Sequence, residues 1–314
     1  MRKALMLILA LAIPAKLHAE TLKLAVGQKG FWDTSIAVWG DRAGFFKKEG
    51  LTLEVLYTDG GAETQQAVIS GSVEIGIGTG TLGVVGAYVR KAPVRIFEAE
   101  WHGASDLFWY ARADSPIHSL KDAAGKTAGF SAAGSSSHLV LLALLEAAGV
   151  QAKPTPTGGA AATLTQVMSG QIDIGWSVPP VGLADVDAGK IRIVARGTDV
   201  PSLASQTTRV NIVNANYYAA HPDVIARFDR AYKASLAWAY SDPQAIQWFA
   251  EGLNVDPAVA KRAQTEFYHE DAMRPDRILG LDTTLKQAIE LKRVPANTTL
   301  EQVRGVIEFP PKAP

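Results

Sequence analysis

Three serines and a histidine follow a glycine in the stretch GSSSH, residues 134–138, and they admit more than one chemistry. A serine nucleophile with a histidine base would catalyse acyl transfer, but the nucleophile turn G-x-S-x-G needs a second glycine, which is missing here. At a helix N-terminus, serine hydroxyls instead cap free backbone N–H groups, and such groups also attract anions. Capping and ligand binding are therefore the two main interpretations, and catalysis is a minor one.

The histidines do not form a metal-binding pattern. Beyond the N-terminal segment they stand at His102, His118, His138, His221 and His269. None of their spacings matches H-E-x-x-H or a related motif, and the chain has no cysteine. The sequence therefore predicts no metal site and no disulfide, and nothing in it calls for a cofactor.

The elements that position these residues are built twice. Residues 58–83 and 157–182, which are 99 positions apart, align without a gap and share ten of 26 residues. Each copy has a helical stretch that ends in Ser-Gly and is followed by a short apolar strand, VEIGIG or IDIGWS. A strand, a loop and a helix precede each copy, so each half of the chain follows a β-α-β-α-β order.

This order predicts an α/β protein with two lobes, each a doubly wound and mainly parallel sheet. A chain of 314 residues, 47% of them hydrophobic, is also long enough for two cores. After residue 220 the pattern is helical, and these C-terminal helices are assigned to lobe 1. Lobe 1 is expected over residues 20–110 and 215–314, and lobe 2 over residues 111–214. A hinge is expected near 109–113 and 210–214.

Open parallel sheets bind ligands at the carboxyl ends of their strands. This rule selects the loops 28–34, 78–81, 132–137 and 177–180, together with the end of the strand 94–101. Three of the seven tryptophans lie in or beside these segments, as a binding surface would require. The ligand-binding residues predicted on this basis are Gln28, Phe31, Trp32, Thr79, Gly80, Thr81, Trp101, His102, Ser131, Ser135, Ser136, Trp176, Pro179 and Asn211.

The chemistry of these loops favours a small organic anion. They hold many hydroxyls but no arginine, which argues against a phosphate ester held by a bidentate arginine. A sulfonate or carboxylate fits, with its carbon part on aromatic rings, and so does a neutral heteroaromatic such as a pyrimidine.

The N-terminus has the pattern of a signal peptide. Arg2 and Lys3 precede a ten-residue apolar run that is too short to span a bilayer, and small residues before Ala19 mark the expected cleavage site. A retained N-terminal anchor is the alternative. Cleavage would leave 28 basic and 31 acidic residues without a basic run, so no nucleic-acid partner is expected. We expect an exported, periplasmic and monomeric protein.

Several motifs resemble those of periplasmic solute-binding proteins of ABC importers, in the sulfonate/nitrate/taurine and thiamine-precursor-like group. They are AGFFKKEGLTLEV, VISGSVEIGIG, SLKDAAGKTAGF and QVMSGQIDIGW, at residues 43–55, 68–78, 119–130 and 166–176, and AAHPDVIARFDRAYKASLAWAYSDPQAI at 219–246. The resemblance covers nearly the whole mature chain and implies a two-lobed, type II-like binding-protein fold.

The resemblance also implies a function without catalysis. A small molecule would bind in the cleft between the lobes and favour their closure, and an ABC permease in the inner membrane would recognise the closed form. A sensor module that presents the ligand to a membrane receptor is the main alternative, and an exported enzyme is a further one. The related pyrimidine synthase carries a cysteine-rich motif, which this chain lacks.

Overall fold

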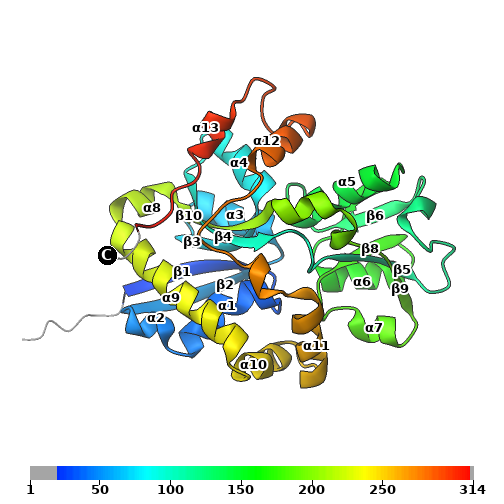
Figure 1. The fold of residues 1–314 in the computed structure, drawn as a ribbon, viewed down its shortest axis with the longest axis horizontal. Coiled ribbons are helices and arrows are strands. Elements are labelled where there is room, and N and C mark those ends of the chain that lie inside the picture. Colours follow the sequence, from blue (N-terminus) through cyan, green and yellow to red (C-terminus); the bar gives the residue numbers. More distant parts are fainter. Residues whose placement is uncertain (1–19, 312–314) are drawn as a thin grey trace, which may run out of the picture.

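The protein, described over residues 20–311 of a computed structural model, has two five-stranded sheets, one in each of two lobes (Figure 1). The predicted signal peptide, residues 1–19, lies outside the described residues. The first sheet contains β1 (Glu20–Gly27), β2 (Leu51–Thr58), β3 (Ile75–Gly80), β4 (Val94–His102) and β10 (Thr207–Asn214). The second contains β5 (Phe108–Arg112), β6 (Thr127–Phe130), β7 (Lys153–Pro156), β8 (Ile174–Ser177) and β9 (Ile191–Arg196).

The two sheets have the same design. Their strand orders are β2-β1-β3-β10-β4 and β7-β6-β8-β5-β9. In each, the first three strands are parallel, and the fourth position holds an antiparallel strand, β10 or β5, that comes from the other half of the chain. The predicted pair of mainly parallel α/β sheets is thereby confirmed.

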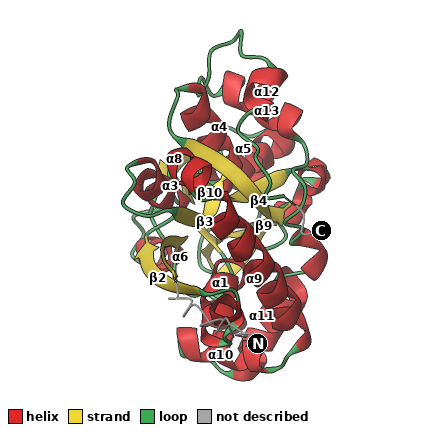
Figure 2. Ribbon diagram, turned by 90° about the vertical axis from the view of Figure 1, so that its left-hand side faces the viewer, coloured by secondary structure: helices red, strands yellow, loops and turns green. Residues whose placement is uncertain are grey.

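Helices lie on both faces of the strands (Figure 2). In the first half of the chain they are α1 (Trp32–Arg42), α2 (Phe45–Lys48), α3 (Gly61–Ile69) and α4 (Thr81–Val89), and in the second α5 (Ser136–Ala148), α6 (Ala160–Met168) and α7 (Leu183–Asp187). Because helices cover the first sheet on two sides, every residue of β3 is buried.

The C-terminal helices are mostly added to the first lobe, as predicted. They are α8 (Ala215–Ala220), α9 (Pro222–Ser241), α10 (Gln244–Leu253), α11 (Pro257–Phe267), α12 (Leu281–Glu290) and α13 (Leu300–Arg304). Helix α9 packs on α1 and α2, and α12 and α13 pack on α4. Helix α11 also reaches the second lobe, where Arg262 lies 2.9 Å from Asp187 of α7 (Figure 1).

The chain crosses between the lobes at residues 103–107 and 197–206. These two crossings run side by side, since Gly103 N–H donates to the carbonyl of Gln206 and Gly197 N–H donates to that of Leu107, both at 2.9 Å. The predicted boundaries are corrected accordingly, because β5 lies wholly in the second sheet and β10 in the first. An apolar strand pattern does not show which sheet the strand will join. We define lobe 1 as residues 20–102 and 207–311, and lobe 2 as residues 108–196.

The sequence repeat reappears in the hydrogen bonds. Thr58 and Thr64 in lobe 1 have their hydroxyl oxygens 2.7 Å apart, and so do Thr157 and Thr163 in lobe 2, each 99 positions later. In both lobes the second threonine also donates to the carbonyl that precedes the helix, that of Gly60 or Gly159. The pair thus fixes the start of α3 and of α6 against the end of the preceding strand.

The change Thr163→Val tests the contribution of this pair. The substitution keeps the shape of a fully buried side chain but removes its hydroxyl, so we expect the free energy of unfolding to fall by about 1 kcal/mol in urea denaturation. Thr165→Val on the exposed side of the same helix is the control and should change stability by less than about 0.5 kcal/mol. Equal effects of the two substitutions would contradict the structural role of the pair.

Candidate ligand-binding site

A cavity lies between the lobes, at the carboxyl ends of the central strands. It has ≈ 430 Å³ of atom-free space, including its opening. Gln28 and Phe31 are shared with a wider cleft of ≈ 990 Å³ that leads outward between the lobes past Tyr57 and Ala160. The cavity therefore has a route to solvent and an inner end enclosed by both lobes.

Four helices begin at this cavity, and one of them is α4, whose N-cap residue Gly80 belongs to the lining. The lining also includes Thr34 in the first turn of α1, Gly61 at the start of α3, and Ser136 at the start of α5. The first N–H groups of a helix have no partner within it, and they give this end a partial positive charge. Lobe 1 thus contributes three helix N-termini and lobe 2 contributes one.

Glycines allow the backbones to approach closely around the cavity. A Cβ atom on Gly61 would lie 2.5 Å from the carbonyl oxygen of Gly78, in the same lobe. One on Gly80 would lie 2.6 Å from the carbonyl oxygen of Gly134, which belongs to lobe 2. Gly80 is therefore a point where the two lobes touch through backbone atoms alone.

The serines form a network and not a catalytic pair. Ser135 caps α5, because its hydroxyl accepts a hydrogen bond from His138 N–H at 3.2 Å. The Ser137 hydroxyl lies 3.0 Å from those of both Ser131 and Ser135. The His138 ring stacks on Phe130 and its Nδ1 accepts from Gly134 N–H, while burial lowers its pKa to about 4. His138 is thus neutral and turned toward the backbone, with no serine bonded to its ring.

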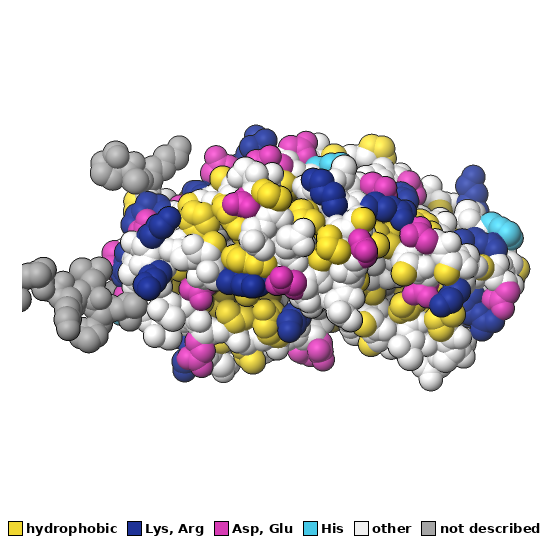
Figure 3. Space-filling view, turned by 90° about the horizontal axis from the view of Figure 1, so that it is seen from below, with side chains coloured by type: hydrophobic (Ala, Val, Ile, Leu, Met, Phe, Trp, Pro, Cys, Tyr) yellow, Lys and Arg dark blue, Asp and Glu magenta, His cyan; other side chains and the backbone are white. Residues whose placement is uncertain are grey.

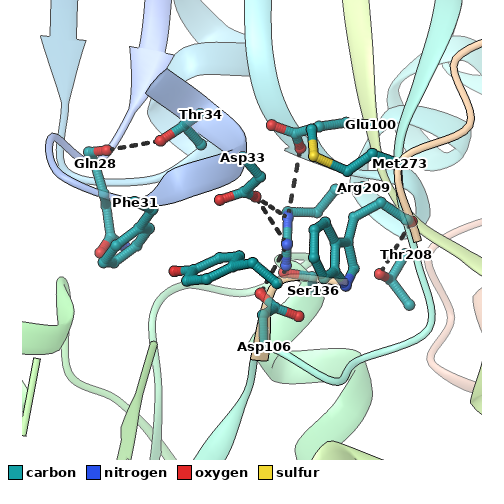
Figure 4. A network of polar contacts seen from close by, with 12 residues as sticks. Gln28, Phe31, Asp33, Thr34, Glu100, Asp106, Ser136, Thr208, Arg209 and Met273 are labelled. Atoms are coloured by element: carbon teal, nitrogen blue, oxygen red, sulfur yellow. Dashed lines mark hydrogen bonds and ion pairs between the residues drawn. The ribbon is translucent and has the colours of Figure 1, made fainter. Parts of the chain in front are cut away.

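Arg209 of β10 is the basic side chain among the described residues that line the cavity. It is buried, and its Nη2 lies 2.8 Å from Asp33 Oδ2 and 2.7 Å from Asp106 Oδ2 (Figure 4). Its Nε lies 3.4 Å from Glu100 Oε2, and its Nη1 lies 3.5 Å from the Ser136 hydroxyl across the lobes. One guanidinium therefore faces three carboxyl groups.

Burial shifts the charges in this cluster. It raises the pKa of Asp106 to about 6, although Arg209 opposes the shift, and it raises the pKa of Glu100 well above its ordinary value, aided by the charge of Asp33. Burial alone would lower the pKa of Arg209, but Asp106, Asp33 and Glu100 outweigh it, so the guanidinium stays protonated. Burial thus favours the protonated form of Glu100, while Arg209 keeps its charge beside Asp33 and Asp106.

The structure brings half of the sequence-predicted ligand residues into this cavity. They are Gln28, Phe31, Gly80, Ser131, Ser135, Ser136 and Trp176. Contact between these residues and a ligand stays a prediction. They come from both lobes, as the rule of strand carboxyl ends requires.

The other seven predicted residues have different neighbours. Trp32 packs edge-on against Trp39 and Phe249, and Trp101 against Tyr268, so both indoles belong to the core. The remaining five bond to other parts of the protein. The Thr79 hydroxyl donates to the carbonyl of Val210, and the Thr81 hydroxyl donates to that of Thr207. The Asn211 amide donates to Glu98, the Pro179 carbonyl accepts from the Tyr268 hydroxyl, and His102 Nδ1 bonds the Thr207 hydroxyl. A strand end fixes where a residue lies but not which way its side chain points.

The expectation of a site without arginine is wrong. Arg209 reaches the cavity from within a strand, whereas the sequence argument considered only the loops. Asp33 and Asp106 were also missed. The sequence does contain a signal for them, because Arg209 is the one charged residue in the strand TTRVNIVN. A charge in a buried strand requires partners of opposite charge nearby.

Two lobes joined by two crossings, with a cavity between them, define the architecture of periplasmic solute-binding proteins. The alkanesulfonate-binding protein SsuA from Xanthomonas axonopodis pv. citri, solved with bound MOPS, matches with a TM-score of 0.75 and 18% identity over 92% of this chain and 98% of that one. The periplasmic aliphatic sulphonate binding protein SsuA from Escherichia coli matches with a TM-score of 0.68 and 21% identity over 90% of this chain and 96% of that one. The nitrate-binding protein NrtA from Synechocystis PCC 6803 matches with a TM-score of 0.73 and 14% identity over 92% of this chain and 86% of that one.

A family model described as NMT1/THI5 like matches residues 34–246. Since the match spans more than half of the sequence, the chain belongs to the NMT1/THI5-like family. No curated protein matches the sequence significantly. The resemblance to the sulfonate/nitrate and thiamine-precursor-like group is therefore confirmed, and the solved structures show that this chain shares their fold.

Gly80→Ala tests the contact between the lobes. A methyl group this close to the backbone of Gly134 and Ser135 should destabilise the present arrangement by about 1–3 kcal/mol and move the lobes apart. We expect a larger radius of gyration in small-angle X-ray scattering. Gly252→Ala is the control, since a Cβ there meets nothing within 4 Å. Identical scattering from both variants would argue against this contact.

Arg209→Met tests the ion cluster. Loss of the guanidinium leaves buried carboxylates uncompensated, so we expect the unfolding free energy to fall by about 3–5 kcal/mol at pH 7.5. The pKa values of Asp106 and Glu100 are already raised in the folded state, and the substitution raises them further. These carboxyl groups ionise at lower pH in the unfolded chain than in the folded variant, so the variant's free energy of unfolding falls as the pH rises. The destabilisation should therefore be smaller at pH 5 than at pH 7.5.

Urea unfolding of Arg209→Met at both pH values measures this difference. Arg209→Lys keeps the charge and serves as the control, with a smaller loss expected at pH 7.5. A loss of stability that is the same at pH 5 and pH 7.5 would show that packing, and not charge, explains the role of Arg209.

Proposed function

We propose that the chain is a periplasmic solute-binding protein that captures a small organic anion and delivers it to an ABC importer in the inner membrane. The observation that carries the proposal is the cavity itself, where helix N-termini of both lobes meet beside the contact of Gly80 with Gly134. The N–H groups at the starts of α3 and α5 suit a sulfonate or carboxylate group. The rings of Phe31 and Trp176 suit its carbon part.

Closure of the lobes would couple binding to transport. A ligand that touches both lobes stabilises their closed arrangement by its differential affinity, and the permease recognises that form. We place the hinge at the crossings 103–107 and 197–206, because these are the segments that join the two lobes. No chemical step is required of the site.

The location follows from the N-terminal pattern. We propose that a signal peptide is removed after Ala19 and that the mature protein acts as a monomer in the periplasm. Among the described helices, none is both long and apolar enough to cross a membrane. On the face shown in Figure 3, positive and negative side chains are interspersed over both lobes, which gives nucleic acid no basic patch on that face.

Ligand binding is tested with the purified mature protein. Sulfonates, aromatic carboxylates, amines and pyrimidines are screened by thermal shift, and a true ligand at a hundred times its dissociation constant should stabilise the protein by about 2.7 kcal/mol. Scattering with that ligand should show a smaller radius of gyration. If no compound in these classes raises the melting temperature, the ligand proposal is wrong. Binding without compaction would contradict hinge closure.

A sensor module for a membrane receptor is the second candidate, since it would use the same cavity. The two functions differ in what is lost when the gene is deleted. An importer component is needed for uptake of the radiolabelled ligand at low concentration. A sensor component is needed for the transcriptional response to that ligand, while uptake continues.

A further inference from the structure

A segment of lobe 1 connects the two lobes besides the crossings. It consists of α11 and the residue that follows it, residues 257–268, and we call it the strap. In Figure 1 the strap lies between α10 of lobe 1 and α7 of lobe 2. Its last two residues, Phe267 and Tyr268, are both buried, and between them they contact both lobes.

Tyr268 anchors the strap in lobe 1. Its ring lies edge-on to Trp101 of β4 and to Phe249 of α10, with ring centroids 5.7 Å and 6.1 Å apart. Its backbone carbonyl accepts a hydrogen bond from the Tyr240 hydroxyl of α9 at 3.1 Å. Because the ring is fully buried among these groups, its position is fixed relative to lobe 1.

The end of the strap also bonds to lobe 2. The Tyr268 hydroxyl donates to the carbonyl of Pro179 at 2.7 Å, and both residues are buried. The ring centroid of Phe267 lies 6.1 Å from that of Phe108 in β5, and the guanidinium carbon of Arg196 lies 5.0 Å from it. The strap is therefore fixed in one lobe and bonded to the other.

The lobes cannot separate without breaking the buried hydrogen bond. The Tyr268 ring is held in lobe 1, so its hydroxyl cannot follow Pro179, and a shift of about 1 Å already removes the bond. In separated lobes water can bond the Pro179 carbonyl instead. The surface pair of Arg262 and Asp187 adds less to the contact, because both side chains are partly exposed to solvent.

We propose that the strap is a latch, which holds the two lobes together before any ligand binds, through the bond of Tyr268 to Pro179. The latch rests on the lobe movement of the proposed function and specifies what sets its equilibrium in the ligand-free protein. The ligand-free chain then populates mainly the present arrangement, and it opens by releasing the strap from lobe 2. A ligand consequently needs less of its binding energy to bring the lobes together.

Double electron–electron resonance on the mature, ligand-free chain tests the latch. The sequence has no cysteine, so Gln66→Cys on α3 and Thr165→Cys on α6 provide one exposed spin-label position in each lobe. We expect one main distance between the labels. Tyr268→Phe keeps the packed ring but removes the hydroxyl. It should lower the ratio of joined to separated lobes about five-fold or more, which adds a second, longer distance.

Thr79→Val is the matched control for the buried bond. The Thr79 hydroxyl donates to the carbonyl of Val210 at 2.8 Å, but both residues belong to lobe 1. Its loss should lower the urea midpoint of unfolding without adding a longer distance.

Asp187→Asn is a second, milder test at the surface of the strap. It weakens the pair with Arg262, so it should lower the ratio of joined to separated lobes about two-fold. Glu251→Gln is its control, because Glu251 pairs with Arg42 at 3.2 Å on the surface of lobe 1 alone. This control should leave the distance distribution unchanged.

The outcomes separate the latch from the proposed function. An unchanged distance distribution in Tyr268→Phe overturns the latch, and so does an equal change in Thr79→Val, because the fold would then be loosened in general. A wild-type chain found mainly with separated lobes overturns it as well. Gly80→Ala serves as the comparison, since it should separate the lobes at their other contact. If only Gly80→Ala adds the longer distance, the latch fails and lobe movement stands. If neither variant adds it, hinge closure fails too.

Discussion

The buried guanidinium of Arg209 is the interaction on which the geometry of the cleft depends. Its partners come from α1, from β4 and from the crossing at residues 103–107, and its remaining N–H group approaches α5 in the other lobe. The Trp101 ring lies 5.4 Å from the guanidinium carbon and holds it from one side. A single side chain thus connects the helix start, the crossing and both lobes.

The fold was predictable because its signals are local and repeated. Gly149 ends α5 with φ 63°, a left-handed conformation that glycine adopts readily, and the central strands β3 and β8 have apolar patterns and are fully buried. The 99-residue repeat shows the same pattern of helix, glycine stop and strand in both halves of the chain, so each half supports the prediction for the other. The sheet to which a crossing strand belongs was not predictable, because β5 and β10 pair with residues far away in the sequence and their own pattern fits either sheet.

The site was predictable as a set of loops but not as a set of side chains. Ser135 and Gly80 lie where the strand-end rule places them. Trp32 lies in the right loop but turns into the core, because the first turn of α1 directs it toward Trp39 and Phe249. Arg209 points into the cavity from the interior of a strand, and only the three-dimensional position of its partners shows it. Loop composition therefore underestimated the charge of the cavity.

The position of the carboxyl groups around Arg209 matters more than their effect on stability. A buried ion cluster rarely stabilises a fold more than apolar packing would, so the arrangement around Arg209 is poor as a stabilising device. Its position gives it another use. Asp106 lies in a crossing between the lobes, and Ser136 lies in lobe 2, so the Arg209 cluster joins the two lobes at the edge of the cavity. Under the proposed function, a ligand in this cavity would touch the same few atoms that join the lobes, which is the condition for a ligand to shift a conformational equilibrium.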